Sequence, residues 1–554
     1  MTCFWACASV LVLCSLGLAS QHCTANQTCW PSSDTWSSFN SSIDGRLVSP
    51  HPPAWPCHDP NYDELACNIA KANWNNAFWR SNQTGASQDP VWDSLLCEID
   101  TPQNVTCEQG AVPVYSVAAR DSSHVSKSVK FAGDHNLKLV VKNTGHDYLG
   151  RSSGEGSFSI WTHELKGINF TKSFIPVGCS EDSGHGVPTV TVGAGEQWAD
   201  IYRAANNQNV TVSGGAARSV GAAGGWVQGG GHGPLSGLYG MGVDNVLEFT
   251  LVKPNGDIVK ANSCQNKDVF WALRGGGGST WGVTLDVTYR THPPLDSVVA
   301  VQFVVNTTTS QQMVDIAKVF LRALPGLTDT GARGYVYWLP SNSFGGILIH
   351  PNSLSVESTN NTLLPVYEWV ANNNGVRAVS EGSIHSTFYD MYSLYIGDLG
   401  IAIPTWLSSR LVSRQAFIEN TDSLAKLVQT NNSAIPIGMN IVGGGVINGV
   451  DPNSTALNPQ WRRDALAVWG YTGTWSHDTP ADIIEGIKKS VTELTQRVGE
   501  VAGLDDASYL NEADPLEPKW QKAFFGSHYE RLLNIKREVD PNGLFGCNRC
   551  VGFQ

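Results

Sequence analysis

Charged residues are scarce in this chain, and basic residues are the scarcer kind. Asp, Glu, Lys and Arg make up 15% of the 554 residues, and the formal net charge is −13. No run of Lys or Arg occurs. Because affinity for DNA or RNA comes largely from basic side chains that neutralise phosphates, this balance argues against a nucleic-acid partner. An apolar content of 41% is typical of a compact globular protein.

Long apolar runs are missing after the first twenty residues, so we expect no transmembrane helix and no membrane partner. Residues 1–20 contain an uncharged apolar stretch from Phe4 to Leu18, followed by small residues. This pattern is typical of a secretory signal peptide cleaved near Ala19 or Ser20, and it is short for a membrane anchor. We therefore expect a secreted, extracellular protein.

The cysteine count agrees with export. Ten cysteines remain after residue 20, an even number that permits full disulfide pairing. Six of them lie between Cys23 and Cys107, which predicts an irregular, disulfide-tied region over residues 21–110. Cys547 and Cys550 form a CxxC pair that a redox protein could use, but at the end of an exported chain we favour a structural disulfide, to each other or to distant partners. Ten Asn-x-Ser/Thr sequons predict a glycoprotein: Asn26, Asn40, Asn82, Asn104, Asn169, Asn209, Asn306, Asn360, Asn431 and Asn453.

At this length two or more domains are expected. Hydrophobic periodicity predicts alternating strands and helices over 111–295, including a short strand at Val210–Val212 and a glycine-dense stretch from Gly214 to Gly242. An α+β second domain is expected over 296–500, where no repeat occurs. Residues 501–554 are expected to return to the first domain, with one helix over Ala523–Glu538.

Four motifs in a fixed order carry the chemistry. They are Val141-Lys-Asn-Thr-Gly-His146-Asp-Tyr-Leu-Gly-Arg-Ser-Ser153, the glycine-rich loop Gly221–Gly240, Asp268-Val-Phe-Trp-Ala-Leu-Arg-Gly-Gly-Gly-Gly278, and a C-terminal segment from Tyr509 to Phe545. Together they resemble the vanillyl-alcohol oxidase superfamily in its berberine bridge enzyme-like branch. The resemblance covers the segments 113–295 and 505–551, and the rest of the chain contributes little to it.

The resemblance implies an α+β protein with a two-lobed FAD-binding domain of the PCMH type and an α/β substrate domain over the flavin. In the family, the histidine of the first motif bonds to the flavin 8α-methyl group, and this role maps onto His146. The expected non-covalent FAD contacts come from the same loops and from the C-terminal segment: Lys142, Asn143, Thr144, Gly145, Asp147, Gly150, Arg151, Ser152, Gly221, Gly230, Gly231, His232 and Asn511.

Many members of the family add a second, cysteinyl bond to the flavin from the glycine-rich loop. The corresponding position here is Gly224, and no cysteine occurs between Cys179 and Cys264. We therefore expect a single covalent link, through His146. Members with one link generally have a less open flavin site, which makes bulky oligosaccharides less favoured substrates.

Family catalytic groups often come from a Tyr-x-Asn-Tyr-like motif, which here is Tyr509-Leu-Asn511-Glu512. If this segment is a strand, Tyr509 and Asn511 share one face and Glu512 points elsewhere. Tyr509 is then the favoured catalytic group, and Glu512 is the base if it reaches the pocket. His528 is favoured as a helix cap and His232 as a structural residue of the flavin loop. No metal-ligand spacing stands out.

These features predict an FAD-linked oxidoreductase that takes a hydride from an alcohol, a sugar or a secondary metabolite. Dioxygen is a possible electron acceptor, which distinguishes an oxidase from a dehydrogenase. The alternative is a flavin-fold cyclase or isomerase of secondary metabolism without net redox chemistry. A Trp-rich carbohydrate-binding protein is a third reading, which the scattered positions of the 19 tryptophans disfavour. We expect a monomer that acts on a small molecule.

Overall fold

The computed structural model describes residues 22–94, 97–180, 186–430, 432 and 434–553. Two of the sequence predictions, the signal peptide and the sequon at Asn431, lie outside these residues. All ten cysteines after residue 20 form disulfides. Four of the five bonds join cysteines at most ten residues apart, and the fifth, Cys179–Cys264, spans 85 residues. The pairs are Cys23–Cys29, Cys57–Cys67, Cys97–Cys107, Cys179–Cys264 and Cys547–Cys550.

The N-terminal region contains more helix than its sequence predicts. Ser32 and Asp63 cap two ten-residue helices by accepting hydrogen bonds from backbone N–H groups of the first turn. The expectation of an irregular region was therefore wrong in part. Its elements are α1 (Ser33–Ser42), β1 (Leu47–Val48), α2 (Glu64–Asn73) and α3 (Ala77–Ser81).

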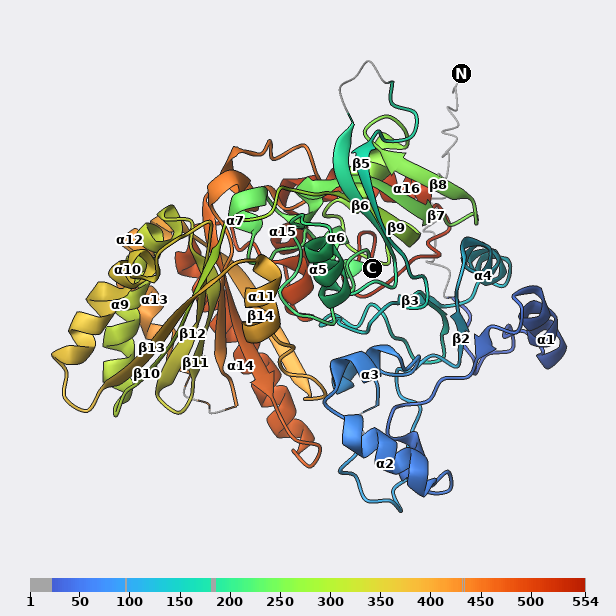
Figure 1. Cartoon of the computed structure of the whole chain (residues 1–554). Helices are drawn as coiled ribbons and strands as arrows, with labels where there is room; N and C mark the ends of the chain where they lie inside the picture. Colours follow the sequence, from blue (N-terminus) through green and yellow to red (C-terminus); the bar gives the residue numbers. More distant parts are fainter. Residues whose placement is uncertain (1–21, 95–96, 181–185, 431, 433, 554) are drawn as a thin grey trace, which may run out of the picture.

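The region expected to bind FAD is built on two sheets (Figure 1), a four-stranded one with the order β1-β2-β4-β3 and a five-stranded antiparallel one with the order β5-β6-β9-β7-β8. The predicted strand at Val210–Val212 is wrong, since only an isolated bridge joins Thr211 to His292 there. The elements are β2 (Tyr115–Ala118), α4 (Ser122–Asp134), β3 (Leu139–Lys142), β4 (Phe158–Trp161), β5 (Ile168–Phe174), β6 (Val187–Gly193), α5 (Trp198–Asn207), α6 (Gly225–Gln228), α7 (Ser236–Tyr239), β7 (Val246–Val252), β8 (Ile258–Asn262), α8 (Lys267–Leu273) and β9 (Val283–Arg290).

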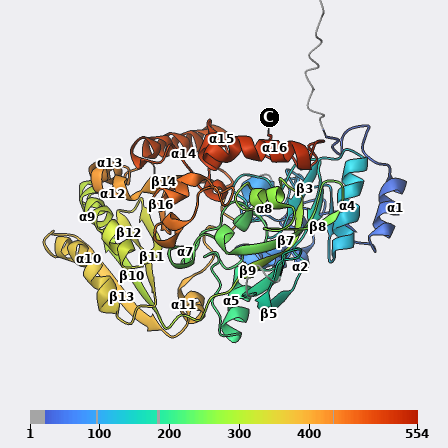
Figure 2. The same cartoon turned by 90° about the horizontal axis from the view of Figure 1, so that it is seen from above.

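The second domain is a seven-stranded antiparallel sheet with the order β13-β10-β12-β11-β15-β16-β14. Helices cover one of its faces (Figures 1 and 2), where Val336 and Trp338 pack in a core with Phe320 of α9. The elements are β10 (Val298–Asn306), α9 (Ser310–Asp329), β11 (Arg333–Leu339), β12 (Ser343–Pro351), α10 (Val356–Ala371), β13 (Arg377–His385), α11 (Phe388–Tyr395), β14 (Thr405–Ser413), α12 (Arg414–Glu419), α13 (Thr421–Lys426), β15 (Ile437–Ile441), β16 (Ala465–Thr474) and α14 (Ala481–Ala502).

The C-terminal segment runs from the second domain back to the FAD-binding region, as α14, α15 (Trp520–Phe525) and α16 (Tyr529–Val539) show in Figure 2. The predicted single helix over Ala523–Glu538 is wrong, because Gly526 adopts φ +56° and separates α15 from α16. Lys536 donates to the carbonyl of Thr280 at 2.8 Å, and Asn548 donates to that of Leu149 at 3.0 Å.

Candidate active site

The loop after β3, residues 143–153, is shaped by two glycines and one carboxylate. Gly145 and Gly150 adopt φ +84° and +68°, conformations that side chains disfavour, and a Cβ at Gly150 would lie 2.4 Å from the Trp92 ring. Asp147 accepts hydrogen bonds from the backbone N–H groups of Leu149 (3.1 Å) and Ser152 (2.7 Å). These contacts give the loop one shape and turn its polar groups toward a cleft.

This cleft is the candidate FAD site. It gathers eight of the residues predicted to contact the cofactor: Asn143, Thr144, Gly145, His146, Asp147, Arg151, Ser152 and Gly221. The side-chain carbonyls of two lining residues, Asn143 and Gln228, are buried without a partner. A Cβ at Gly224 or Gly225 would meet nothing nearer than 3.8 Å. Unpaired polar groups beside a glycine wall fit a flat, polar cofactor such as FAD.

Arg151 supplies a positive charge to this cleft. Its guanidinium is buried, with Nε 3.4 Å from Oδ1 of Asp147, and Nη2 donates to Oδ1 of Asn511 at 3.1 Å. An arginine held by two acceptors in a cleft suits an anionic cofactor, because its remaining donors are already oriented.

The other predicted cofactor residues lie around the cleft rather than in its lining. The Lys142 ammonium group donates to the carbonyls of Gln83 (2.6 Å) and Thr84 (3.1 Å), and burial lowers its pKa to about 7. Gly150 packs on Trp92, and Gly230 and Gly231 take positive φ where side chains would strike Leu457 and Trp226, respectively. Asn511 donates to the carbonyls of Gly225 and Trp226, and so ties the C-terminal segment to the glycine-rich loop.

A second cavity of about 1020 Å³ opens next to the cleft, and Val220 and Trp226 line both. The sheet face opposite the helices forms one wall. Because side chains alternate along a strand, Tyr335 and Tyr337 of β11 point into this cavity while Val336 and Trp338 point into the core. Most of the lining residues are apolar or aromatic. Apart from tyrosines, the titratable side chains among the lining residues that the structure describes are His232, Glu381 and Glu512, and neither Lys nor Arg occurs among them.

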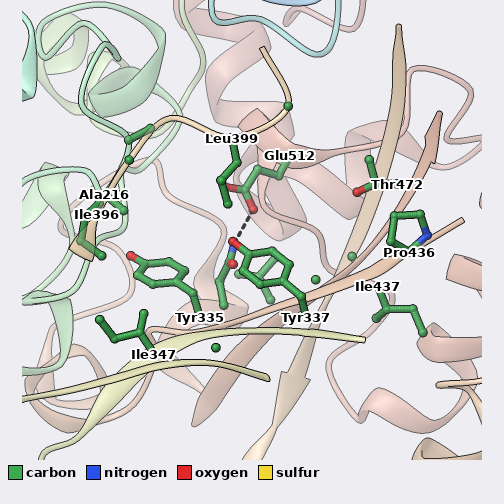
Figure 3. A pocket seen from close by; sticks show the side chains of 18 of the residues that line it. Ala216, Tyr335, Tyr337, Ile347, Ile396, Leu399, Pro436, Ile437, Thr472 and Glu512 are labelled. Carbon is green, nitrogen blue, oxygen red and sulfur yellow. Dashed lines mark hydrogen bonds between the residues drawn. The ribbon is translucent and has the colours of Figure 1, made fainter. Parts of the chain in front are cut away.

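Glu512 is the carboxylate at the centre of this second cavity. Its Oε1 accepts a hydrogen bond from Nε2 of His232 at 3.0 Å, and its Oε2 accepts one from Nδ2 of Asn440 at 2.9 Å. Figure 3 shows Glu512 facing the hydroxyl end of Tyr337, with Leu399 beside it, while the hydroxyl of Tyr335 points toward Ile396. The side chain is 24% exposed, so it remains open to a bound molecule.

The segment that carries Tyr509 and Glu512 contains a 3₁₀ turn, Leu510–Glu512, so the arrangement considered for a strand does not apply. In such a turn residues three apart lie on the same side, so Tyr509 and Glu512 both line the cavity. Asn511 still meets Tyr509, because its Nδ2 donates to the phenol oxygen at 2.8 Å. Burial and the nearby Glu512 raise the pKa of Tyr509, which keeps the phenol protonated.

Several residues of the site were missed by the sequence analysis. Asn440, Tyr335 and Tyr337 come from the second domain, where no motif marked them, although alternation along β11 could have indicated a polar face. Ser219 contacts His146 and also Asp398, which comes from a distant segment, and nothing in the sequence signals that meeting. His528 packs edge-on against Trp271, with ring centroids 5.2 Å apart, instead of facing either cavity.

In the described ranges no group of three or more His, Cys, Asp and Glu side chains is arranged to hold a metal ion. Likewise, no helix among the residues that the structure covers is long and apolar enough to cross a membrane.

Comparison with known proteins shows which families and relatives this chain resembles. The family "FAD binding domain" matches residues 113–262, and the family "Berberine and berberine like" matches residues 508–552. An FAD-linked oxidoreductase of Arthroderma benhamiae is 42% identical over 538 residues, which are 96% of this chain and 94% of that protein. The FAD-linked oxidoreductase apf9 of Gibberella fujikuroi is 33% identical over 98% of this chain and 95% of its own length.

The fold has a solved counterpart as well. The crystal structure of a VAO-type flavoprotein from Myceliophthora thermophila C1 superposes with a TM-score of 0.89 at 26% sequence identity, covering 96% of this chain and 97% of that one. The fold and its paired cavities therefore define an FAD-dependent oxidoreductase with a separate substrate domain. The chain belongs to the vanillyl-alcohol oxidase superfamily, in its berberine bridge enzyme-like branch.

Proposed function

We propose that this chain is a secreted oxidoreductase that takes a hydride from an alcohol or amine carbon of a bulky, largely apolar metabolite and passes it to FAD held covalently by His146. The observation that carries the proposal is the position of Glu512. It is a carboxylate inside an apolar cavity that shares two wall residues, Val220 and Trp226, with the flavin cleft.

Glu512 is the proposed base. As a carboxylate it accepts hydrogen bonds from His232 and Asn440, and these fix its orientation while a substrate hydroxyl or amine donates to it. Bound FAD supplies the hydride acceptor: the substrate loses a hydride from carbon and a proton to Glu512, and the electron pair passes on to an acceptor such as dioxygen, which gives hydrogen peroxide. Tyr509, kept protonated, is the proposed hydrogen-bond donor that orients the substrate heteroatom.

The side chains that line the cavity favour an apolar substrate. An aromatic and aliphatic lining stabilises an apolar ring system, whereas a sugar needs many polar partners. With two glutamates and no Lys or Arg in the described lining, the cavity disfavours carboxylates and phosphates and favours neutral or cationic molecules. We therefore propose a secondary metabolite, and not a sugar, as the substrate.

The cofactor link is tested with acid-precipitated protein. The wild-type pellet is expected to stay yellow, and His146→Ala is expected to release its flavin into the supernatant. His292→Ala is a matched control, because it removes a histidine that hydrogen-bonds Asn245 away from the cleft. A wild-type pellet that loses all its flavin contradicts the covalent link.

The activity is tested with purified full-length protein and a panel of aromatic alcohols, cyclic amines, their carboxylated analogues and oligosaccharides. We expect peroxide release and anaerobic bleaching of the flavin band with neutral or cationic apolar members. The competing cyclase or isomerase function predicts a substrate that is converted without ever reducing the flavin.

Secretion rests on the sequence of residues 1–20, and ten paired cysteines support it, because disulfides persist in oxidising compartments. The expected result is a glycosylated protein in the culture medium whose mature chain begins near Ser20 or Gln21. A product that remains inside the cell contradicts this part of the proposal.

A further inference from the structure

A hydrogen-bonded chain of three residues ends at His146. Nε2 of His146 lies 2.7 Å from Oγ of Ser219, and Ser219 donates to Oδ1 of Asp398 through both its hydroxyl (2.9 Å) and its backbone N–H (3.1 Å). The three residues come from separate parts of the sequence. Ser219 precedes the glycine-rich loop, and Asp398 lies between α11 and β14 in the second domain.

The direction of these hydrogen bonds fixes the position of one proton. An ionised carboxylate only accepts, so the Ser219 hydroxyl donates to Asp398, and the serine oxygen then accepts from His146. His146 must therefore carry its ring proton on Nε2, which leaves the lone pair on Nδ1. Burial lowers the pKa of His146 to about 4, so the ring is neutral at ordinary pH and the lone pair is free to react.

The segment with Asp398 also belongs to the substrate cavity. Its neighbours Gly397 and Leu399 line that cavity, whereas His146 lines the flavin cleft. Ser219 thus connects a loop of the substrate domain to the proposed point of flavin attachment.

We propose that Ser219 and Asp398 are positioning residues for flavin attachment, which hold His146 in the tautomer whose Nδ1 bonds to the flavin and which receive the proton from its Nε2. The inference rests on the covalent link given under Proposed function. A metal-bound histidine is oriented by the partner of its other ring nitrogen in the same way.

The attachment balances in atoms and electrons. One C–H bond of the flavin methyl group and one N–H bond of His146 are replaced by one C–N bond, and two protons leave. One of them passes from Nε2 to Ser219 as the serine hydroxyl proton moves to Asp398. The two electrons leave through the flavin to dioxygen, which becomes hydrogen peroxide.

The test compares the covalent fraction of bound flavin in full-length Ser219→Ala, Asp398→Asn and wild-type protein. The fraction is measured from flavin in the acid pellet and supernatant, and the linked peptide is identified by mass spectrometry. We expect both variants to bind FAD but to lose at least tenfold in the rate of covalent incorporation when FAD is added during refolding or expression. Ser219→Thr keeps the hydroxyl and is expected to retain most of the wild-type rate.

Asp390→Asn is the matched control, because it removes a carboxylate of α11 that accepts a hydrogen bond from Ser386 and lies outside the chain from His146 to Asp398. We expect it to attach flavin at the wild-type rate. Unchanged covalent incorporation in both Ser219→Ala and Asp398→Asn overturns the inference while leaving the link itself intact. A wild-type protein without covalent flavin overturns the link instead. If Ser219→Ala fails to fold, as its melting curve reveals, Asp398→Asn decides the question.

Discussion

His232 and Glu512 meet where the glycine-rich loop approaches the C-terminal turn, with the imidazole Nε2 3.0 Å from the carboxylate Oε1. The second domain completes the arrangement, since Asn440 of β15 donates to the other carboxylate oxygen. Two side chains from distant segments therefore orient a single carboxylate carried by a third. This explains why the second domain, which carries no readable motif, still contributes to the site.

Substitution of Glu512 tests the assignment of the base. Glu512→Gln keeps the shape of the side chain but cannot take a proton, so we expect the rate of flavin reduction by substrate to fall by about 10²–10⁴-fold. Anaerobic stopped-flow spectroscopy measures this rate directly. Glu381→Gln, at another carboxylate of the same cavity, is the control and is expected to retain most of the rate. Equal losses in the two variants contradict a specific role for Glu512.

The size of the substrate is tested at Gly438, which lines the cavity from β15. A Cβ there would meet only the Tyr337 ring, at 3.5 Å, so a larger side chain projects into the cavity. We expect Gly438→Phe to lower kcat/KM for bulky substrates by about tenfold or more, a loss of about 1.4 kcal/mol, and to affect small ones little. Flavin content should not change. Gly449→Phe adds the same ring outside the cavity and serves as the control; similar kinetics for the two variants would contradict the substrate assignment.

The single covalent link is tested by supplying the missing sulfur. Gly224 lines the same cleft as His146, and a Cβ at this position would lie 3.8 Å from its nearest neighbour, Nδ2 of Asn143. We expect His146→Ala to release its flavin and the double variant His146→Ala/Gly224→Cys to retain part of it in the acid pellet. Gly224→Ala in the same background is the control without sulfur. Complete release from the cysteine variant means that position 224 does not reach the flavin.

Local patterns in the sequence predicted much of the fold, and contacts between distant segments account for what they missed. Hydrophobic periodicity correctly predicted alternating strands and helices over 111–295, because each of these elements buries one face in the core. The helix predicted across Gly526 failed because that glycine takes φ +56°, a choice that depends on Asn458 and Pro459 packed against it. The hydrogen-bonded chain from His146 through Ser219 to Asp398 was not predictable, since only the folded chain brings together residues so far apart in sequence.

A final prediction concerns pH and His292, whose ring stacks on Tyr239 at 3.8 Å and whose Nε2 lies 2.8 Å from Oδ1 of Asn245. Burial, with a smaller effect of Arg290, lowers its pKa to about 4. The unfolded chain, with a histidine pKa of about 6.5, then binds more protons than the folded protein between about pH 6.5 and pH 4. The stability contributed by the neutral ring is therefore complete above this window and is lost as the pH falls through it.

His292→Gln has no proton to gain, so its melting temperature should fall less steeply than that of the wild type between pH 6.5 and pH 4. The wild type and the variant must be compared with each other, because buried acids change the stability of both in the opposite direction as the pH falls. Burial raises the pKa of Glu98 to about 7 and that of Asp93 to about 6, so protonation of these two carboxyl groups favours the folded state. Those groups are common to both proteins and cancel in the difference of melting temperatures. Parallel curves across this window would mean that His292 does not titrate differently in the folded and unfolded states.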